Sequence, residues 1–504
     1  MPTSPPDGSD PARLERIRSA LVSAGYESSA IAKVLPARIL GTFQRGWSGP
    51  ARRKTDEKTP LHTLLRLFVL GMEVPEKALE EVAEANTADW VRTGLVRIRR
   101  GTAKPLVRLH PGRVADKHLF IASDDVPPNA LVGVPDFVFD SDRTSAQLAS
   151  ATLRRPFGRA LDVGTGNGVQ AVFAAQHCEE VVATDVNPRA LAFAEFNLAL
   201  NGVTNVELRQ GDLYQPVAGE TFDLIVSNPP FVVSPWFEYL HRDSRLPLDE
   251  ISATVVREAG QRLRFGGWAE FNCLWVERSG EPWEERVKSW CATSGCNVAV
   301  LPLIRQDPVT YAIEYVWDVG QIDAELADKR FAELVTYLEE QQVTRVIQGF
   351  VILQKTDSDD PWFLTEELSA ELTTAQADGI AELFEAQEWL VRRPSAESLL
   401  AERFRIPDSV HVEPTLRSED GHWVDAGVTL HKVGGIHSSI HILDPAGRVV
   451  SSCTGERPLQ ELIDVALQRH GVAISPIDSR YRSLITDFEA LVLRLVRTGF
   501  LQPA

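Results

Sequence analysis

The sequence predicts an α/β domain in the middle of the chain, with a smaller domain on either side. From about residue 137 to about residue 356, short runs rich in Val, Ile and Leu alternate with helical stretches, a progression typical of a parallel sheet covered by helices. The first run ends in Asp162 and leads into the glycine-rich turn GTGNG, where such folds pass from strand to helix. A chain of 504 residues is also too long for one core, so two or three domains are expected.

Changes in sequence texture set the predicted domain boundaries at 1–130, 131–356 and 357–504. The alternation of strands and helices begins near residue 137 and continues to VTRVIQGFVILQK (343–355), which is expected to be the last long strand. Asp307 and Pro308 form a helix-start signal within this domain. The polar stretch TDSDDPWF (356–363) is typical of a linker and separates the last domain.

The N-terminal domain combines helical patterns with a hairpin signal. Residues 12–35 and 61–71 have the apolar spacing of helices, and Asn86 or Thr87 can cap a further helix that ends before Gly94. The alternating residues that follow turn at Gly101, which indicates a β-hairpin. Three helices followed by a hairpin are the order of a winged helix, so a winged-helix-like fold is predicted.

Positive charge is concentrated in this N-terminal domain. Residues 38–114 contain 15 Lys and Arg against 8 Asp and Glu, a net charge of +7, so the total of −18 leaves −25 for the remainder. A basic module on an acidic body is typical of proteins that bind a polyanion. Arg97, Arg99 and Arg100 of the hairpin are therefore predicted to contact nucleic acid. The alternative is a basic surface that docks on the acidic remainder or on another protein.

The C-terminal domain is predicted to be α+β. Helical patterns at 373–389 and 396–403 precede alternating segments, and helices near 457–469 and 479–497 follow. The domain shows no catalytic motif. Its histidines fall on alternating strand positions and the five cysteines of the chain are scattered, so neither a metal site nor a disulfide framework is predicted. Without an apolar signal segment or a membrane-length apolar run, a cytoplasmic protein with no membrane contact is expected.

Three acids fall at the ends of three successive strands of the α/β domain. Asp162, Asp185 and Asp212 should meet at the carboxyl edge of the sheet, where doubly wound folds bind ligands. An acid there can accept both ribose hydroxyls of a nucleoside, and another can meet an adenine amine. The turn reads G-x-G-x-G, unlike the G-x-G-x-x-G of dinucleotide enzymes. Singly, each acid could be a turn or helix-cap residue; together, and followed by Asn-Pro-Pro-Phe (228–231), they indicate a nucleoside cofactor.

These segments resemble a known family. LDVGTGNG, VVATDVNPRAL, GDL and DLIVSNPPF look like the class I S-adenosylmethionine-dependent methyltransferases, in the branch with an N-P-P-F/Y signature that methylates planar amines and amides. The resemblance covers about residues 137–356 and implies a Rossmann-like fold with S-adenosylmethionine as the cofactor. It also implies that Asp162 and the three glycines face the methionine portion, Asp185 and Asn187 the ribose, and Asp212 the adenine.

Within this branch, SNPPF is most similar to the bacterial ribosomal RNA guanine methyltransferases. The release-factor glutamine methyltransferases more often have Tyr at the position of Phe231. The first predicted acceptor is therefore an exocyclic base amine of ribosomal or transfer RNA, and the second is a glutamine of a protein such as a release factor. A small-molecule acceptor, a dehydrogenase, and a non-catalytic nucleic-acid-binding regulator with a relic cofactor fold are the further alternatives.

The Asn-Pro-Pro-Phe motif has a chemical rationale. An exocyclic amine or an amide is a poor nucleophile because its lone pair is conjugated. The Asn228 side-chain oxygen and the Pro229 carbonyl can accept its two N–H groups and hold the nitrogen in line with a sulfonium methyl. The prolines fix the spacing of the two acceptors, and Phe231 offers a face for a planar group.

The predicted site residues follow from these observations. The predicted catalytic residues are Asn228, Pro229, Pro230 and Phe231. The predicted cofactor-binding residues are Asp162, Gly164, Thr165, Gly166, Gly168, Asp185, Asn187, Asp212 and Asn228. The predicted substrate-binding residues are Phe231, Trp236, Tyr239, Arg242, Arg97, Arg99 and Arg100. Trp236, Tyr239 and Arg242 belong to an aromatic and charged loop that either contacts substrate or packs against the N-terminal domain.

Overall fold

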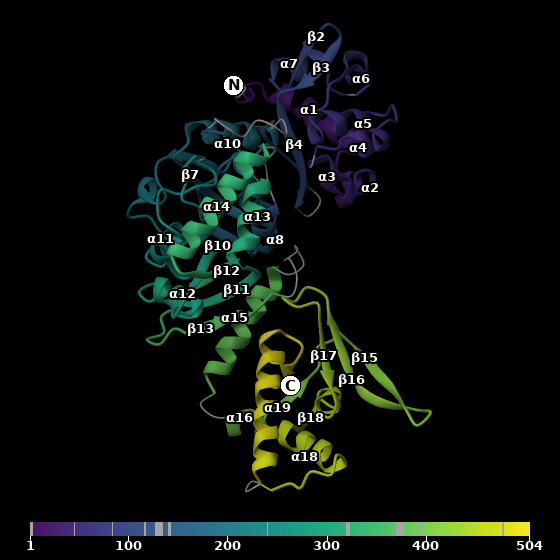
Figure 1. The fold of residues 1–504 in the computed structure, drawn as a ribbon, viewed down its shortest axis with the longest axis vertical. Coiled ribbons are helices and arrows are strands. Elements are labelled where there is room, and N and C mark those ends of the chain that lie inside the picture. Colours follow the sequence, from purple (N-terminus) through teal and green to yellow (C-terminus); the bar gives the residue numbers. More distant parts are fainter. Residues whose placement is uncertain are drawn as a thin grey trace. The chain divides into compact units, whose positions relative to one another are not determined.

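The computed structural model describes residues 4–44, 46–82, 84–114, 117–125, 135–139, 143–238, 240–318, 323–368, 377–393, 396–475 and 478–504. The chain forms two compact units, residues 1–149 with 155–366 and residues 150–154 with 367–504 (Figure 1). The first unit contains both the predicted N-terminal domain and the predicted α/β domain. The predicted boundary between them, at residue 130, lies outside the described residues.

The N-terminal region of the first unit is a set of short helices and two hairpins. Its helices are α1 (Pro11–Ser23), α2 (Ser28–Val34), α3 (Ala37–Gln44), α4 (Gly49–Lys54), α5 (Pro60–Leu64), a π-helical turn (Leu65–Val69), α6 (Glu76–Glu80) and α7 (Thr87–Arg92). Its strands are β1 (Val74–Pro75), β2 (Val96–Arg99), β3 (Thr102–Pro105), β4 (Val107–Val114) and β5 (Lys117–Asp124). The predicted hairpin is present as β2–β3, and β1 joins it in the order β1-β3-β2.

The predicted cap of α7 is also present. The Asn86 side chain accepts from the Asp89 backbone at 3.0 Å, and the Asp89 carboxylate accepts from the Asn86 backbone at 3.2 Å. This reciprocal capping box satisfies two backbone donors at the helix start. The helix is followed at once by the hairpin, which agrees with the predicted order. The winged-helix-like assignment itself remains a prediction.

The centre of the first unit is an eight-stranded sheet. Its strands are β6 (Phe157–Val163), β7 (Cys178–Asp185), β8 (Val206–Gln210), β9 (Phe222–Ser227), β10 (Leu263–Arg278), β11 (Cys296–Gln306), β12 (Val343–Lys355) and β13 (Phe363–Thr365), in the order β13-β11-β12-β10-β9-β6-β7-β8. Strands β6 to β10 are parallel, whereas β12 lies antiparallel between β10 and β11. This inserted antiparallel strand departs from the usual dinucleotide-binding strand order and so argues against the dehydrogenase alternative.

The sheet continues past residue 356, the predicted end of the α/β domain. Residues Phe363–Thr365 add a short edge strand parallel to β11, and the Trp362 backbone is bonded to Asn297. The polar stretch before it is therefore a connection within the sheet, because the unpaired edge of β11 is covered by the chain that follows. The division into three domains remains a prediction.

Helices cover both faces of this sheet (Figure 1). The helices are α8 (Arg143–Ala151), α9 (Val169–Ala174), α10 (Pro188–Leu200), α11 (Glu250–Ala259), α12 (Trp283–Cys291), α13 (Pro308–Asp318) and α14 (Ala324–Glu340), with a 3-10 turn at Gln215–Val217. Along β10, Cys273 and Trp275 pack with α11 and α12, whereas Leu274 and Val276 pack with α13 and α14. Alternate residues of one strand thus belong to two cores, as expected for a sheet buried on both sides.

The N-terminal region and the sheet share one hydrophobic core through α10. Phe193 and Phe196 of α10 are fully buried together with residues of α1, including Leu14 and Ile17. Asn197 completes the junction, because its side chain donates to the Ala122 carbonyl at 2.9 Å and accepts from the Ala122 backbone N–H at 2.7 Å. The N-terminal region is thus packed directly against the α/β part of its own unit.

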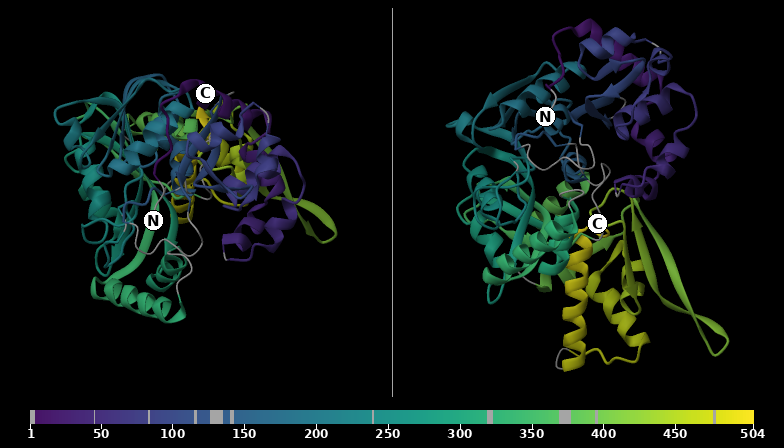
Figure 2. Two further views of the ribbon diagram at one scale, coloured as in Figure 1. Left: turned by 90° about the horizontal axis from the view of Figure 1, so that it is seen from above. Right: turned by 45° about the horizontal axis from the view of Figure 1, so that its top comes forward.

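The second unit is α+β, as predicted. Its helices are α15 (Ala377–Val391), α16 (Ala396–Ala401), α17 (Ala446–Ser451), α18 (Leu459–Arg469) and α19 (Ser479–Arg497). Its strands are β14 (Arg403–Arg405), β15 (Val410–Glu419), β16 (His422–Lys432), β17 (Ser439–Leu443), β18 (Thr454–Pro458) and β19 (Gln502–Pro503), in two three-stranded sheets. The long hairpin β15–β16 extends away from the helices of this unit (Figure 1; Figure 2).

Metal-binding clusters and membrane-spanning helices are both absent from the described part of the chain. Among those residues no group of three or more His, Cys, Asp or Glu side chains could hold a metal ion. Within the same residues no helix is long and apolar enough to cross a membrane.

Candidate functional site

A cavity of about 480 Å³ lies at the carboxyl ends of the parallel strands of the first unit. One side, named here the strand-end wall, is formed by Gly164, Thr165, Gly166, Asp185, Asn187 and Asp212. The other side, named the aromatic wall, is formed by Phe137, Phe139, Phe237, Leu240 and His241. Asn228, Pro230 and Ser145 also line the cavity. All six residues of the strand-end wall are among the predicted cofactor-binding residues, but neighbouring positions that were not predicted, Asn167, Val186, Gly211 and Leu213, line the cavity as well. Phe137, Phe139 and Leu240 of the aromatic wall were not singled out in the sequence.

Asp162 holds the glycine-rich turn through hydrogen bonds from within the core. One of its carboxylate oxygens accepts from the Thr165 hydroxyl at 2.5 Å and from the Ala171 backbone at 3.0 Å. The side chain is 1% exposed and is absent from the residues that line the cavity. Burial raises the pKa of Asp162 to about 7. In this structure Asp162 therefore shapes the turn, and its predicted contact with a ligand remains a prediction.

The three predicted glycines differ in position. Gly164 and Gly166 line the cavity with φ of +71° and +57°, so the turn presents backbone there. Gly168 does not line it. A Cβ at Gly168 would lie 2.9 Å from Ala194 Cβ, so this glycine allows the turn to pack closely on α10.

Asp185 holds the middle of the strand-end wall. Its two oxygens accept from the Gly166 backbone and from the Asn187 backbone, each at 2.8 Å. Burial raises the pKa of Asp185 above its usual range. Asn187 caps α10, and its amide also donates to the Asp136 carbonyl at 3.1 Å. Asp212, after the end of β8, lines the cavity with an exposed side chain.

Asn228 follows the end of β9 and its amide is held in one orientation. The amide nitrogen donates to the hydroxyls of Thr144 and Ser145, both at 3.1 Å. The side-chain oxygen is buried and accepts no hydrogen bond from any residue that the structure describes. A buried carbonyl oxygen without a donor is costly. The site therefore presents one unsatisfied acceptor at the place where the strand ends.

The rest of the Asn-Pro-Pro-Phe motif is divided between the cavity and the core. Pro230 lines the cavity, whereas Pro229 is buried and does not. Phe231 is 8% exposed and packs with Val233, Leu274 and neighbouring apolar residues. The Phe231 ring does not line the cavity. Stacking of this ring on a substrate remains a prediction, and it would require the ring to move out of the core.

The aromatic wall is built from two segments about a hundred residues apart. The rings of Phe139 and His241 are stacked, with centroids 5.0 Å apart and planes at 10°. Phe137 meets His241 edge-on at 5.8 Å. Burial lowers the pKa of His241 to about 4, with a smaller contribution from Arg242. His241 is therefore neutral near pH 7, and the wall offers flat rings without a positive charge.

Other predicted loop residues hold the loop rather than line the cavity. The Arg242 guanidinium lies 4.1 Å from the ring centre of Tyr315, and Trp236 packs on the same tyrosine at 5.5 Å. Both therefore anchor the loop on α13. Tyr239 lies outside the described residues. Arg97, Arg99 and Arg100 are exposed on the hairpin β2–β3 and do not line the cavity.

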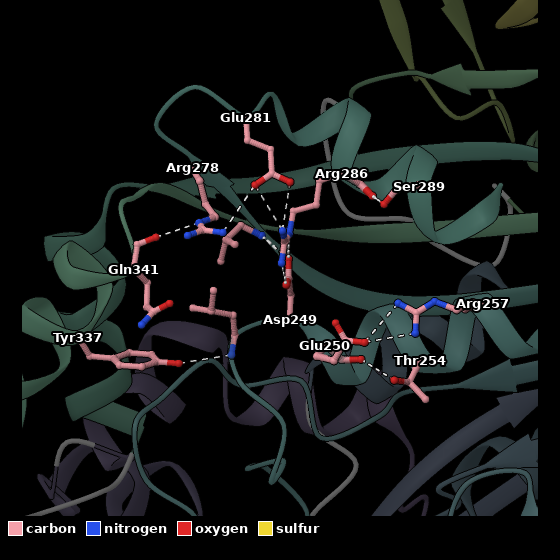
Figure 3. Close-up of polar contacts among 12 residues, drawn as sticks. Asp249, Glu250, Thr254, Arg257, Arg278, Glu281, Arg286, Ser289, Tyr337 and Gln341 are labelled. Atoms are coloured by element: carbon pink, nitrogen blue, oxygen red, sulfur yellow. Dashed lines mark hydrogen bonds and ion pairs between the residues drawn. The ribbon is translucent and has the colours of Figure 1, made fainter.

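A buried ion pair fixes the end of this loop. Asp249 is fully buried and accepts from Arg286 at 2.6 and 2.8 Å, and also from the Val276 backbone at 3.0 Å. Figure 3 shows Arg286 between Asp249 and Glu281. The same view shows the exposed pair of Glu250 and Arg257 one residue further along the chain, at 3.2 Å. The loop that contributes Phe237, Leu240 and His241 to the aromatic wall thus ends at a buried residue that is held by an ion pair and a backbone hydrogen bond.

Several residues of the site were not found from the sequence. Phe137, Phe139 and Ser145 precede the glycine-rich turn in weakly patterned sequence, and Thr144 is recognised only by its bond to Asn228. Phe237, His241 and Asp243 belong to the aromatic and charged loop, but nothing in the sequence distinguishes them from Trp236 and Arg242. The available signal was composition alone, which does not say which side chains turn inward.

Comparison with known proteins finds a family match over the residues of this site. Residues 138–268 match the model of the methyltransferase small domain, which agrees over that range with the resemblance seen in the sequence. Residues 23–106 and 381–503 match two domains of unknown function, DUF7059 and DUF7782. The flanking regions therefore have relatives whose roles are not described.

Curated relatives make the comparison more specific. A release factor glutamine methyltransferase of Xylella fastidiosa (strain 9a5c) is 45% identical over 131 residues, which are 23% of this chain and 47% of that protein. Ribosomal RNA small subunit methyltransferase C of Escherichia coli O1:K1 / APEC is 30% identical over 226 residues, 43% of this chain and 62% of that protein. The chain thus spans about half of the first of these relatives and somewhat more of the second.

Proposed function

We propose that this chain is an S-adenosylmethionine-dependent N-methyltransferase whose first acceptor is a base amine of ribosomal or transfer RNA. The observation that carries the proposal is the buried Asn228 side-chain oxygen, oriented by two hydroxyl partners of its amide nitrogen and left without a donor. An amine N–H of a substrate supplies the missing donor. The match of residues 138–268 to the methyltransferase small domain supports the same reading.

The strand-end wall fits S-adenosylmethionine. Asp185 presents a carboxylate that is already held by two backbone donors, which leaves further lone pairs for ribose hydroxyls. Asp212 lies beside it for an adenine amine, and Gly164 and Gly166 expose backbone for the methionine portion. When bound, S-adenosylmethionine supplies an electrophilic methyl group on its sulfonium.

The protein contributes position and electrostatics to the transfer. Asn228 Oδ1 accepts one N–H of the acceptor amine, and the Pro229 carbonyl accepts the other once the buried Pro229 backbone is opened to the substrate. These two bonds orient the lone pair of the nitrogen and favour its pyramidal geometry. Thr144 and Ser145 hold the Asn228 side chain in place through the two hydrogen bonds that they accept from its amide nitrogen. A strong general base is unnecessary, since the methylated nitrogen is cationic and loses its proton to water.

The aromatic wall favours a planar acceptor. Phe139 and His241 present stacked rings, and Phe137 and Phe237 extend the apolar surface. A base that leaves its stack is bound by such rings and by hydrogen bonds to its edge. The exposed arginines of the hairpin β2–β3 provide phosphate contacts away from the cavity. A winged-helix-like N-terminal domain that binds RNA is part of this proposal.

A protein glutamine is the second candidate acceptor. It is favoured by the 45% identity over 131 residues to a protein named release factor glutamine methyltransferase. A planar amide can use the same Asn228 and Pro229 acceptors and the same flat wall.

Methyl transfer to fractionated cell extract tests the proposal. The protein is incubated with extract and tritiated S-adenosylmethionine, and the labelled material is treated separately with nuclease and protease, with the N228A protein as the control. Nuclease-sensitive label that is absent with N228A is the expected result. Protease-sensitive label would transfer the assignment to a protein acceptor. Binding of cofactor without any label would contradict both acceptors.

A further inference from the structure

Positive charge within the N-terminal region is uneven in a way that the hairpin does not explain. Residues 38–66 contain seven Lys and Arg against two Asp and Glu, whereas residues 67–114, which include the hairpin, contain eight against six. Most of the net charge of the region therefore belongs to α3, α4, α5 and their connections. The hairpin β2–β3, by contrast, shares its part of the chain with the acids of α6.

The cations around α4 are exposed and have no ionic partners. The side chains concerned are those of Arg38, Arg52, Arg53, Lys54 and Lys58. None of them forms an ion pair with any residue that the structure describes. Of the two nearby acids, Asp56 is paired with Arg66 at 3.1 Å, and Glu57 lies 3.9 Å from His62. This surface is therefore electropositive and its charges are available to a ligand.

An exposed aromatic ring lies in the turn that precedes α4. Trp47 lies in the turn between α3 and α4 and is 65% exposed. The turn is fixed, because the Trp47 backbone donates to the Thr42 carbonyl at 3.0 Å. The indole rests against Gly49, where an added Cβ would lie 3.2 Å from its nitrogen. The exposed indole offers an apolar face on which a planar ligand can stack.

The cations and the ring belong to one surface. Arg52 Nε donates to Ser48 Oγ at 3.2 Å, which places its guanidinium beside the residue that follows Trp47. Arg53 and Lys54 of the same helix line an open groove of about 560 Å³, together with Ile39, Pro50, Asp56 and Glu57. We name the surface formed by Trp47, Arg52, Arg53 and Lys54 the α3–α4 platform.

We propose that the α3–α4 platform binds single-stranded RNA, with Trp47 stacking on one base and the three cations contacting the adjacent phosphates. Aromatic rings interleaved with cations are the usual means of holding single strands without sequence preference. The proposal rests on the proposed function and deepens it, since it names the form of RNA and the surface that receives it. Figure 1 shows α3 and the hairpin β2–β3 at opposite ends of the N-terminal region, so the platform is separate from the hairpin surface.

Fluorescence anisotropy with a short labelled RNA of mixed sequence tests the proposal, using the same RNA as a single strand and as a duplex. The full-length W47A protein is compared with W317A, which removes a tryptophan of similar exposure, 70%, on α13. W47A is expected to weaken single-strand binding about tenfold, because stacking on one base is worth about 1–3 kcal/mol. W317A is expected to bind like the wild type, and duplex binding by W47A should be unchanged.

A charge variant completes the design. R52E/R53E/K54E is expected to weaken binding of both RNA forms and to reduce the slope of log affinity against log salt for single strands by about 2, at about 0.7 per phosphate. Equal single-strand affinity of W47A and wild type would overturn the proposal, as would no RNA binding by the wild type. Binding of S-adenosylmethionine to the wild type is measured in parallel. If the wild type does not bind this cofactor, the result counts against the proposed function and not against the α3–α4 platform.

Discussion

The strand-end wall and the aromatic wall of the cavity are constructed in different ways. The strand-end wall consists of residues at or just after the carboxyl ends of the parallel strands β6, β7 and β8, between Gly164 and Asp212. Its hydrogen bonds join residues that are close in the sequence or that lie at the ends of adjacent strands. An example is the bond from the Gly166 backbone N–H to the Asp185 carboxylate. The aromatic wall joins Phe139 to His241 across the intervening chain through the stacking of their rings.

This difference has a consequence for function. A wall made from strand ends inherits the rigidity of the sheet and can hold an invariant ligand such as a cofactor. The aromatic wall is made from residues 137–139 and from the loop that contains His241. The position of this loop depends on contacts away from the cavity, including the ion pair of Asp249 and the contact of Arg242 with Tyr315. Such a wall can differ between proteins that share the same sheet, which suits recognition of different acceptors.

The largest expected effect is at Asn228, where the two walls meet. N228A should lower the rate of methyl transfer about a hundredfold to a thousandfold, by analogy with the loss of one positioned hydrogen-bonding group. Cofactor affinity should change little, because Asp185 and the glycine-rich turn are untouched. Single-turnover rates and cofactor binding by calorimetry measure the two quantities separately. N205A, which changes an amide just before β8 and away from the cavity, is the control. A loss of cofactor affinity alone would show that Asn228 belongs to the strand-end wall.

The next effect concerns the anchor of the aromatic wall. R286A leaves the fully buried Asp249 without its partner, so the free energy of unfolding should fall by about 3 kcal/mol. R257A breaks the neighbouring pair with Glu250, whose side chains are 46% and 40% exposed, and should cost less than about 1 kcal/mol. Denaturant unfolding of both variants gives the comparison. Similar losses would mean that the end of the loop is not a special point of support.

The cofactor side of the comparison is tested at two acids. D185A should weaken S-adenosylmethionine binding by up to about a hundredfold, since hydrogen bonds to a charged group are worth about 1.5–3 kcal/mol. D212A should weaken it less, because the Asp212 side chain is exposed and water competes for its contacts. Isothermal titration provides both affinities, and melting temperatures verify that each variant is folded. A larger loss for D212A would reverse the assignment of ribose and adenine.

The smallest effect is a pH dependence in the aromatic wall. The pKa of His241 is lowered from 6.5 to about 4, so between these values the unfolded chain binds a proton that the folded protein does not. Stability should therefore fall as the pH decreases from about 6.5 to 4, by about 2 kcal/mol from this residue. H241F keeps a flat ring and removes the titration. The difference in unfolding free energy between wild type and H241F should change across this window, and a constant difference would refute the burial of a neutral histidine.

Much of the fold was predictable because its signals are local. The capping box at Asn86, the helix start at Pro308 and the long strand Val343–Lys355 all occur where the sequence predicts them. Each depends on residues within a few positions of one another. The edge strand Phe363–Thr365 was missed, because a three-residue strand is recognised only by its pairing with β11.

The candidate site divides along the same line. The sequence by itself determined the strand-end wall, because a residue that follows a parallel strand must lie at the carboxyl edge of the sheet whatever the rest of the chain does. Only the tertiary structure decided which aromatic rings face the cavity. Phe231 packs into the core, and Trp236 packs on Tyr315 of α13. Phe139 and His241 instead stack on each other in the cavity wall. The physical reason is that the direction of a loop side chain depends on packing against distant elements, and local sequence does not encode those contacts.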